Sequence, residues 1–194
     1  MDETPPMRQS KYKCVRSYNV PGDAHELTFS CFHGLPLLGK DRSRGWFVSA
    51  MRCARRDLKL SLWAYVIMPE HVHLLFCPQE AEYKIARVRT ALKAPVTAKA
   101  LRFLRSTTPS FLEKLKDAQP NGQVHYRFWQ RGGGYDRNVV QLTTLLHMID
   151  YIHQNPVRRG LVEKATDWVW SCARFYAGMR PVPIDMDPLP SLDG

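Results

Sequence analysis

The sequence lacks the features that mark several large classes of protein. No apolar run approaches the roughly 18 residues that a membrane span needs, so no transmembrane segment is predicted. The first 13 residues, MDETPPMRQSKYK, contain no hydrophobic stretch of the kind found in secretory signals. The 5 cysteines are scattered and form no CxxC pair, which argues against a zinc ribbon or a disulfide framework. We therefore expect a protein of the reducing cytoplasm.

Common catalytic motifs are also missing, and acidic residues are scarce. There is no GxxxxGK[ST], no GxGxxG after a strand, no GxSxG and no HExxH. The usual nucleotide-binding, serine-hydrolase and zinc-protease patterns are thus absent. The 28 Lys and Arg residues exceed the 18 Asp and Glu residues, for a net charge of +10. Such an excess favours a polyanionic partner, of which nucleic acid is the commonest.

Hydrophobic periodicity predicts alternating strands and helices. The expected strands are residues 25–32, 60–68, 71–77 and 124–130. The expected helices are residues 41–58, 80–105 with a break or a kink at Pro95, and 138–155, which should end before Pro156. This pattern predicts a small α+β domain in which one sheet is backed by helices.

The two ends of the chain differ in composition from the middle. Residues 1–23 are polar and contain prolines, which predicts a flexible arm. Residues 179–194 are rich in Pro and Asp, which predicts a disordered tail. The domain itself should span residues 24–178, in which residues 106–123 have no assigned role.

Two histidines stand two residues apart in a predicted strand, at His71 and His73. Alternate residues of a strand project from the same face, so both imidazoles should point the same way while Val72 packs behind them. Two adjacent imidazoles can form half of a divalent-metal site. The simpler interpretation is a pair of solvated histidines.

The last predicted helix carries Tyr151 and Asn155 four residues apart, which places both on one helical face. The face that should be buried carries Leu142, Leu145, Leu146, Ile149 and Ile152. An Asn oxygen one turn from a phenol could complete a metal site beside a nucleophile. The spacing alone favours the simpler interpretation, an exposed Tyr and an Asn that caps the helix before Pro156.

Basic residues gather in two regions and alternate with aromatic residues in the second. Phosphate contacts need such cations, and unpaired bases stack on aromatic rings. The predicted DNA-binding residues are Lys84, Arg87, Arg89, Lys93, Arg127, Arg131, Arg137, Arg158 and Arg159.

Four segments in this order resemble a known family: WAYVIMPEHVHLLF, RFWQRGGGYDRN, IDYIHQNPVRRGLV and DWVWSCARFYAG. The sequence is similar to the REP-associated tyrosine transposases, which are single-tyrosine HUH enzymes related to the IS200-like transposases. The resemblance covers about residues 24–178. It implies a ferredoxin-like HUH endonuclease fold with an antiparallel sheet, and cleavage and rejoining of single-stranded DNA near a REP-like hairpin.

The resemblance also implies roles for individual residues. His71 and His73 match the metal-binding histidines, Asn155 matches the third ligand, and Tyr151 matches the nucleophile that forms a 5′-phosphotyrosine bond. The implied cofactor is Mg²⁺ or Mn²⁺. Tyr135, in a Gly-rich segment, is a competing nucleophile. The general base is not identified.

Three functions remain open from the sequence. The first is a metal-dependent tyrosine endonuclease and transposase that acts on single-stranded or hairpin DNA as a monomer or homodimer, without a membrane partner. The second is a module on the same fold that binds hairpin DNA without cutting it. The third is an RNA-binding or RNA-processing protein, because single-stranded RNA suits the same basic and aromatic surface.

Overall fold

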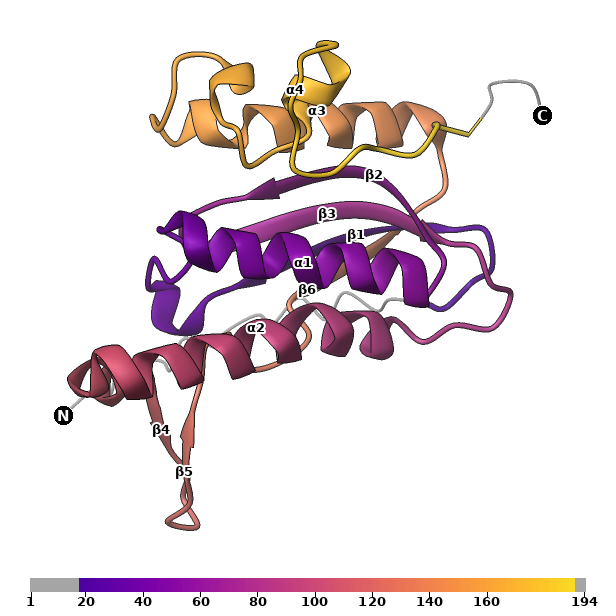
Figure 1. Ribbon diagram of the computed structural model, residues 1–194. Coiled ribbons are helices and arrows are strands. Elements are labelled where there is room, and N and C mark those ends of the chain that lie inside the picture. Colours follow the sequence, from indigo (N-terminus) through magenta and orange to yellow (C-terminus); the bar gives the residue numbers. More distant parts are fainter. Residues whose placement is uncertain (1–17, 191–194) are drawn as a thin grey trace, which may run out of the picture.

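A four-stranded antiparallel sheet forms the centre of the molecule (Figure 1). The computed structural model describes residues 18–190. The strands lie in the order β2-β3-β1-β6. They are β1 (Ala24–Ser30), β2 (Leu60–Ile67), β3 (His71–Pro78) and β6 (Tyr135–Val139). The predicted α+β class with an antiparallel sheet is confirmed.

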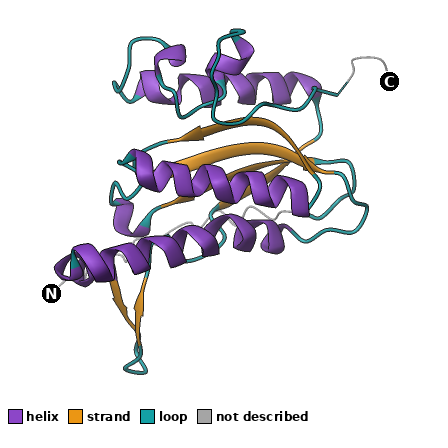
Figure 2. Ribbon diagram, viewed as in Figure 1, coloured by secondary structure: helices purple, strands orange, loops and turns teal. Residues whose placement is uncertain are grey.

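The helices cover the two faces of the sheet separately (Figures 1 and 2). Helices α1 (Asp41–Asp57) and α2 (Ile85–Thr107) lie on one face, and α3 (Leu142–Arg158) lies on the other. The short helix α4 (Ala173–Tyr176) lies beside α3. Within residues 18–190, no helix is both long and apolar enough to cross a lipid bilayer.

Alternation along the central strands sorts the side chains between the two faces. In β3, Val72, Leu74 and Phe76 are buried, and the last two line a small cavity between the sheet and the two helices α1 and α2. His71 and His73 point to the α3 side by the same period of two. Burial of the apolar face therefore fixes the register that directs both imidazoles toward α3.

Both prolines that were expected to interrupt helices lie inside them. Helix α2 continues through Pro95, and α3 continues through Pro156 to Arg158, so the predicted break and the predicted end are wrong. Each proline removes one backbone donor. In α2 this loss is offset by residues buried on either side of the proline, including Leu92 and Val96. Pro156 is itself buried in α3.

The start of α3 also differs from the prediction. Residues 138 and 139 belong to β6, where Val139 pairs with Ala24, and the helix begins at Leu142. Pairing with β1 thus outweighs the helical pattern at this point. The predicted strand 124–130 is shorter, because β5 (Val124–Tyr126) pairs only with β4 (Lys116–Ala118). This hairpin, which includes part of the unassigned segment 106–123, projects beside α2 (Figure 2).

The C-terminal segment packs against the sheet, so the predicted disorder is wrong for its described part, residues 179–190. Ile184 and Met186 are buried in the main core. The Asp187 carboxylate accepts a 2.7 Å hydrogen bond from the Leu62 amide, and the Asp187 amide donates to the Leu62 carbonyl. The segment thus covers part of the exposed edge of β2. Residues 191–194 lie outside the described residues.

Most of the predicted N-terminal arm, residues 1–17, also lies outside the described residues. The remainder of the arm contacts the domain. The Asn19 side-chain oxygen accepts a hydrogen bond from the Ile85 amide at the start of α2, and the Val20 carbonyl accepts one from the Tyr83 hydroxyl.

Candidate active site

The two histidines of β3 lie side by side, and each ring forms a hydrogen bond with a neighbouring side chain. The ring centroids of His71 and His73 are 4.9 Å apart. The Nδ1 atom of His73 shares a 2.7 Å hydrogen bond with the Thr28 hydroxyl on β1. His71 Nδ1 donates to a carboxylate oxygen of Glu70 at 3.1 Å. Each ring therefore has Nδ1 engaged by an oxygen, an arrangement that fixes the ring and leaves Nε2 to bind a metal ion.

Burial determines the protonation of the deeper histidine. Desolvation, with a smaller contribution from the His71 imidazole, lowers the pKa of His73 to about 4. His73 is consequently neutral at physiological pH, as a metal-binding imidazole must be.

Helix α3 brings Tyr151 to the same place. The Tyr151 ring lies edge-on to the His73 ring, with 5.7 Å between centroids, and the Arg158 guanidinium carbon lies 4.8 Å from the centre of the phenol ring. Tyr151 is 37% exposed, so it is accessible from solvent. In contrast to the predicted buried stripe, Leu146 is 46% exposed, because α3 covers only part of this side of the sheet.

Asn155 lies one turn beyond Tyr151 and is buried. Its side-chain nitrogen is buried without a hydrogen-bond partner among the described residues. One turn further, Arg159 donates to Glu70 at 2.7 Å. Since Tyr151 contacts β3 at His73 and Arg159 reaches the residue before His71, the intervening Asn155 faces the histidine pair.

This arrangement suits a divalent cation. Two neutral imidazoles and an amide are a mixed nitrogen and oxygen donor set for such an ion. Among residues 18–190, no group of three or more His, Cys, Asp and Glu side chains has the geometry of a metal site. A third protein ligand beside His71 and His73 would therefore come from another residue type. Asn155, whose side chain faces the histidine pair, would supply it through its side-chain oxygen; the side-chain nitrogen is the atom that is buried without a partner among the described residues.

An open pocket of about 600 Å³ lies next to Tyr151. The competing nucleophile Tyr135 also lines it, from β6, together with His147 and Asp150 of α3. Both tyrosines are thus accessible from this pocket, and position alone does not distinguish between them. Tyr151 differs from Tyr135 in that it contacts His73 directly and lies one helical turn from Asn155.

Arg137 and Glu26 form a partly buried ion pair on the wall of this pocket. Their side chains approach to 3.1 Å, and another guanidinium nitrogen of Arg137, Nε, is buried without a partner among the described residues. Burial raises the pKa of Glu26, although the nearby Arg137 charge opposes this shift.

The nine predicted DNA-binding residues separate into several groups. Arg137 and Arg158 line the pocket beside Tyr151, whereas Arg159 pairs with Glu70. Lys84 and Arg87 line a different depression that also contains two glutamates. The remaining four, Arg89, Lys93, Arg127 and Arg131, line a pocket on the α2 side of the sheet.

Sequence reasoning missed the residues that hold the histidines. Glu70 directly precedes His71, so its position next to the pair was a usable signal. Thr28 lies 45 residues before His73 and is brought to it only by the pairing of β1 with β3. No local pattern could have identified it.

Comparison with known proteins identifies two curated relatives by sequence. The chain is 31% identical over 108 residues to a Haemophilus influenzae protein that is provisionally named a REP-associated tyrosine transposase; the match covers 56% of each protein. It is 26% identical over 132 residues to the REP-associated tyrosine transposase of Escherichia coli K12, a match that covers 68% of this chain and 65% of the relative. The chain is thus similar in sequence to REP-associated tyrosine transposases over more than half of its length.

A solved structure extends the likeness to the whole fold. The structure of a REP-associated tyrosine transposase bound to a REP hairpin matches 96% of this chain and 97% of its own chain, with a TM-score of 0.62 and 21% identity. The matched part of this chain spans between about half and two thirds of the length of the curated transposases. No protein-family model matches the sequence.

Proposed function

We propose that this homologue of the transposases cleaves and rejoins single-stranded hairpin DNA of the REP type through a covalent bond to Tyr151, with Mg²⁺ or Mn²⁺ as cofactor. The observation that carries the proposal is the contact between Tyr151 and His73, one turn from Asn155 and beside His71. A relative with the same fold was solved bound to a REP hairpin, which supports this class of substrate.

In the proposed step the Tyr151 oxygen attacks the scissile phosphorus. A tyrosine–phosphorus bond forms, and the bond between phosphorus and the 3′ oxygen breaks. The leaving 3′ oxygen takes up a proton, which yields a 3′-hydroxyl and a 5′-phosphotyrosine. Because one phosphodiester replaces another, the same 3′-hydroxyl can reverse the attack and rejoin the strand.

The protein's own residues orient this reaction. The contact with Arg158 holds the Tyr151 ring, and the Arg137 and Arg158 side chains line the pocket that would receive the phosphate. His147 and Asp150 also line the pocket and are the candidates to accept the phenol proton. A divalent cation, when bound, would polarise the phosphate and stabilise the charge that develops on it.

The test is covalent capture of labelled hairpin DNA. The label is placed on the 3′ side of the cut, because the tyrosine retains that fragment, and the products are run on a denaturing protein gel. Wild type, Tyr151→Phe and Tyr135→Phe are compared in Mg²⁺, Mn²⁺ or EDTA. Each substitution removes one hydroxyl and keeps the ring. We expect metal-dependent labelling of wild type and Tyr135→Phe, and none of Tyr151→Phe.

Each other outcome corrects a specific part of the proposal. Loss of label only in Tyr135→Phe would identify Tyr135 as the nucleophile. Equal labelling in EDTA would refute the need for a metal. Strong gel shifts without any captured label would favour a non-catalytic hairpin-binding module, and equally strong competition by RNA would favour an RNA-binding protein. The choice between monomer and homodimer remains a prediction, which light scattering with and without DNA would test.

A further inference from the structure

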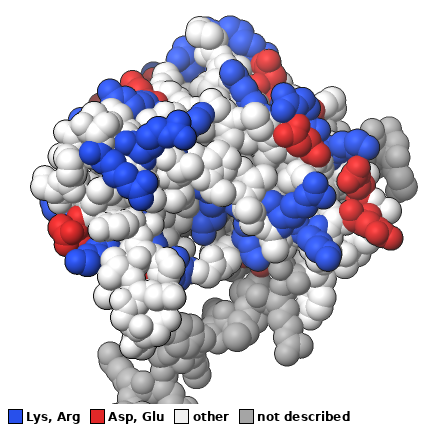
Figure 3. Space-filling model, turned by 60° about the horizontal axis from the view of Figure 1, so that its bottom comes forward, with Lys and Arg blue, Asp and Glu red and all other residues white. Residues whose placement is uncertain are grey.

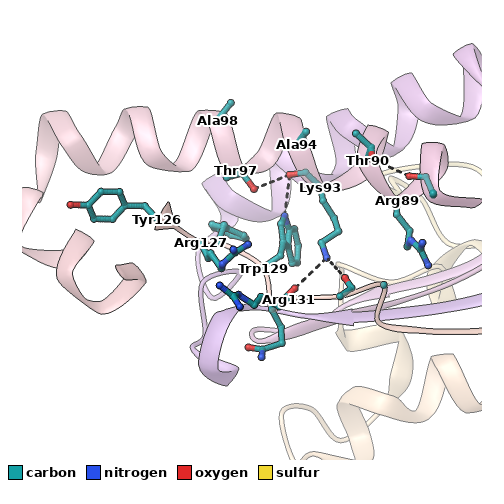
Figure 4. Close-up of a pocket in the computed structure, with 15 residues that line it drawn as sticks. Arg89, Thr90, Lys93, Ala94, Thr97, Ala98, Tyr126, Arg127, Trp129 and Arg131 are labelled. Atoms are coloured by element: carbon teal, nitrogen blue, oxygen red, sulfur yellow. Dashed lines mark hydrogen bonds between the residues drawn. The ribbon is translucent and has the colours of Figure 1, made fainter. Parts of the chain in front are cut away.

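A second basic pocket lies on the opposite face of the sheet from Tyr151. It has a volume of about 610 Å³ and lies between α2 and residues 126–133 (Figure 4). Arg89 stands at one end and Tyr126 at the other, with Lys93 and Arg131 between them. Along α2 the pocket extends from Ala86 to Ala98, which at 1.5 Å per residue is about 18 Å.

The pocket carries positive charge that the protein does not neutralise. Asp117 is paired with both Arg127 and Arg131. Within residues 18–190, Arg89 and Lys93 form no ion pair with a carboxylate, and Lys93 instead donates to the Gln130 and Gly132 carbonyls at 3.5 and 3.4 Å.

Burial and the nearby positive charges lower the pKa of the Lys93 amine. A bound anion would relieve this repulsion. Figure 3 looks onto this side of the molecule, where Lys and Arg side chains are more abundant than Asp and Glu.

Glycines connect the two pockets around an open edge of the sheet. Gly132 and Gly133 line the basic pocket, and Tyr135 lines the pocket of Tyr151. Gly133 and Tyr135 are two residues apart, so their Cα atoms are separated by at most about 7 Å. Strand β6, which begins at Tyr135, is one of the two edge strands of this four-stranded sheet. A chain lying in one pocket can thus reach the other by passing the start of β6.

Gly133 lies directly against the Arg89 side chain. A Cβ atom there would approach a terminal nitrogen of Arg89 to 2.5 Å. The absence of a side chain lets the Arg89 guanidinium lie against the backbone of this segment, directed into the pocket.

From these contacts we infer that the α2 pocket binds the single-stranded extension of a DNA substrate whose scissile phosphate lies beside Tyr151. Arg89 and Arg131 contact phosphates and the Tyr126 ring stacks on a base. A stacked strand rises about 3.4 Å per nucleotide, so the pocket accommodates about five nucleotides. The inference rests on the proposed function, because it assigns a second contact to the same substrate.

The test measures how affinity depends on the length of the single strand. Hairpins with extensions of none to about twelve nucleotides, on the 5′ or the 3′ side, are titrated by fluorescence anisotropy in EDTA, so that no cleavage occurs. For wild type we expect affinity to rise by roughly tenfold or more once one of the two extensions reaches the pocket. In Arg89→Gln/Arg131→Gln this rise should disappear. For hairpins with long extensions, the slope of log affinity against log salt should be less steep in this double variant than in wild type. The expected difference in slope is about 1.4, or 0.7 for each lost phosphate contact.

A charge-matched control separates this site from general electrostatics. Arg56→Gln/Lys164→Gln removes two positive charges from exposed positions that line neither pocket, and should keep the rise. Tyr126→Ala should reduce the rise by on the order of tenfold without changing the salt dependence.

The inference is overturned if Arg89→Gln/Arg131→Gln keeps the rise, or if it weakens blunt hairpins as much as extended ones. The latter result would assign the pocket to the duplex. Failure of the proposed function has a different signature, namely no covalent capture by wild type whatever the extension, and the anisotropy series can still show the rise in that case.

Discussion

Gly134 offers a sharp test of how the start of β6 is positioned. Its φ is +76°, in the left-handed region that side chains other than glycine rarely adopt. A Cβ atom would lie 2.2 Å from the Thr28 carbonyl oxygen and 2.9 Å from Phe29 Cβ. The glycine therefore permits close approach of β6 to β1, and the next residue, Tyr135, pairs with Thr28.

The expected loss of stability has two parts. Left-handed backbone costs an alanine about 1–2 kcal/mol. The clash with backbone and Cβ atoms adds the cost of overpacking, about 1–3 kcal/mol. Gly134→Ala should thus lower the free energy of unfolding by about 2–5 kcal/mol, and each kcal/mol corresponds to about 2–4 °C in melting temperature for a chain of this size.

Gly132 provides a matched control. Its φ is +89°, yet a Cβ atom there would meet nothing within 4 Å. Gly132→Ala should show only the backbone part, about 1–2 kcal/mol. The assay is urea unfolding followed by tryptophan fluorescence, since Trp63 and Trp129 are buried. Equal losses of stability in the two variants would show that the close approach of β6 to Thr28 does not add to the cost of a side chain at position 134.

Two further changes test burial and the C-terminal segment. Glu26→Gln should stabilise the protein increasingly as pH rises above 4.5, because burial raises the pKa of Glu26 above this ordinary value and its ionisation therefore favours the unfolded state. Urea unfolding at about pH 4 and about pH 7 measures this difference, and a pH-independent difference would mean that the Arg137 charge fully offsets burial. Asp187→Ala should cost about 1–3 kcal/mol, because the partly buried Leu62 amide loses its side-chain acceptor. Thermal unfolding of Asp185→Ala, whose side chain is 68% exposed, is the control; equal losses in the two variants would argue against a stabilising role for this contact.

Short-range patterns in the sequence determined much of the candidate site. The period of two along a strand put His71 and His73 on one face, and the helical period put Asn155 one turn from Tyr151. These relations depend only on backbone geometry between near neighbours. The same patterns located β1, β2, β3, α1 and α2 to within about five residues of their observed bounds. They did not predict β6, whose last two residues were assigned to the last helix.

Tertiary packing decided how these local pieces meet. Only the placement of α3 across the sheet brings Tyr151 against His73, and only strand pairing brings Thr28 to the same ring. Both helices run through their prolines, since burial of the surrounding residues outweighs a lost hydrogen bond.

The basic residues and the C-terminal segment lead to the same conclusion. The sequence did not indicate on which face of the sheet each predicted DNA-binding residue lies, whereas the tertiary structure places Arg89 and Arg158 on opposite faces. The segment containing Asp187 looked disordered because of its Pro and Asp content, but the edge of β2 supplies backbone partners for it. The contact between Asp187 and Leu62 joins residues that are 125 positions apart in the sequence. The sequence alone therefore determined which side chains are candidates for the site. The packing of the helices on the two faces of the sheet determined which of these side chains lie together.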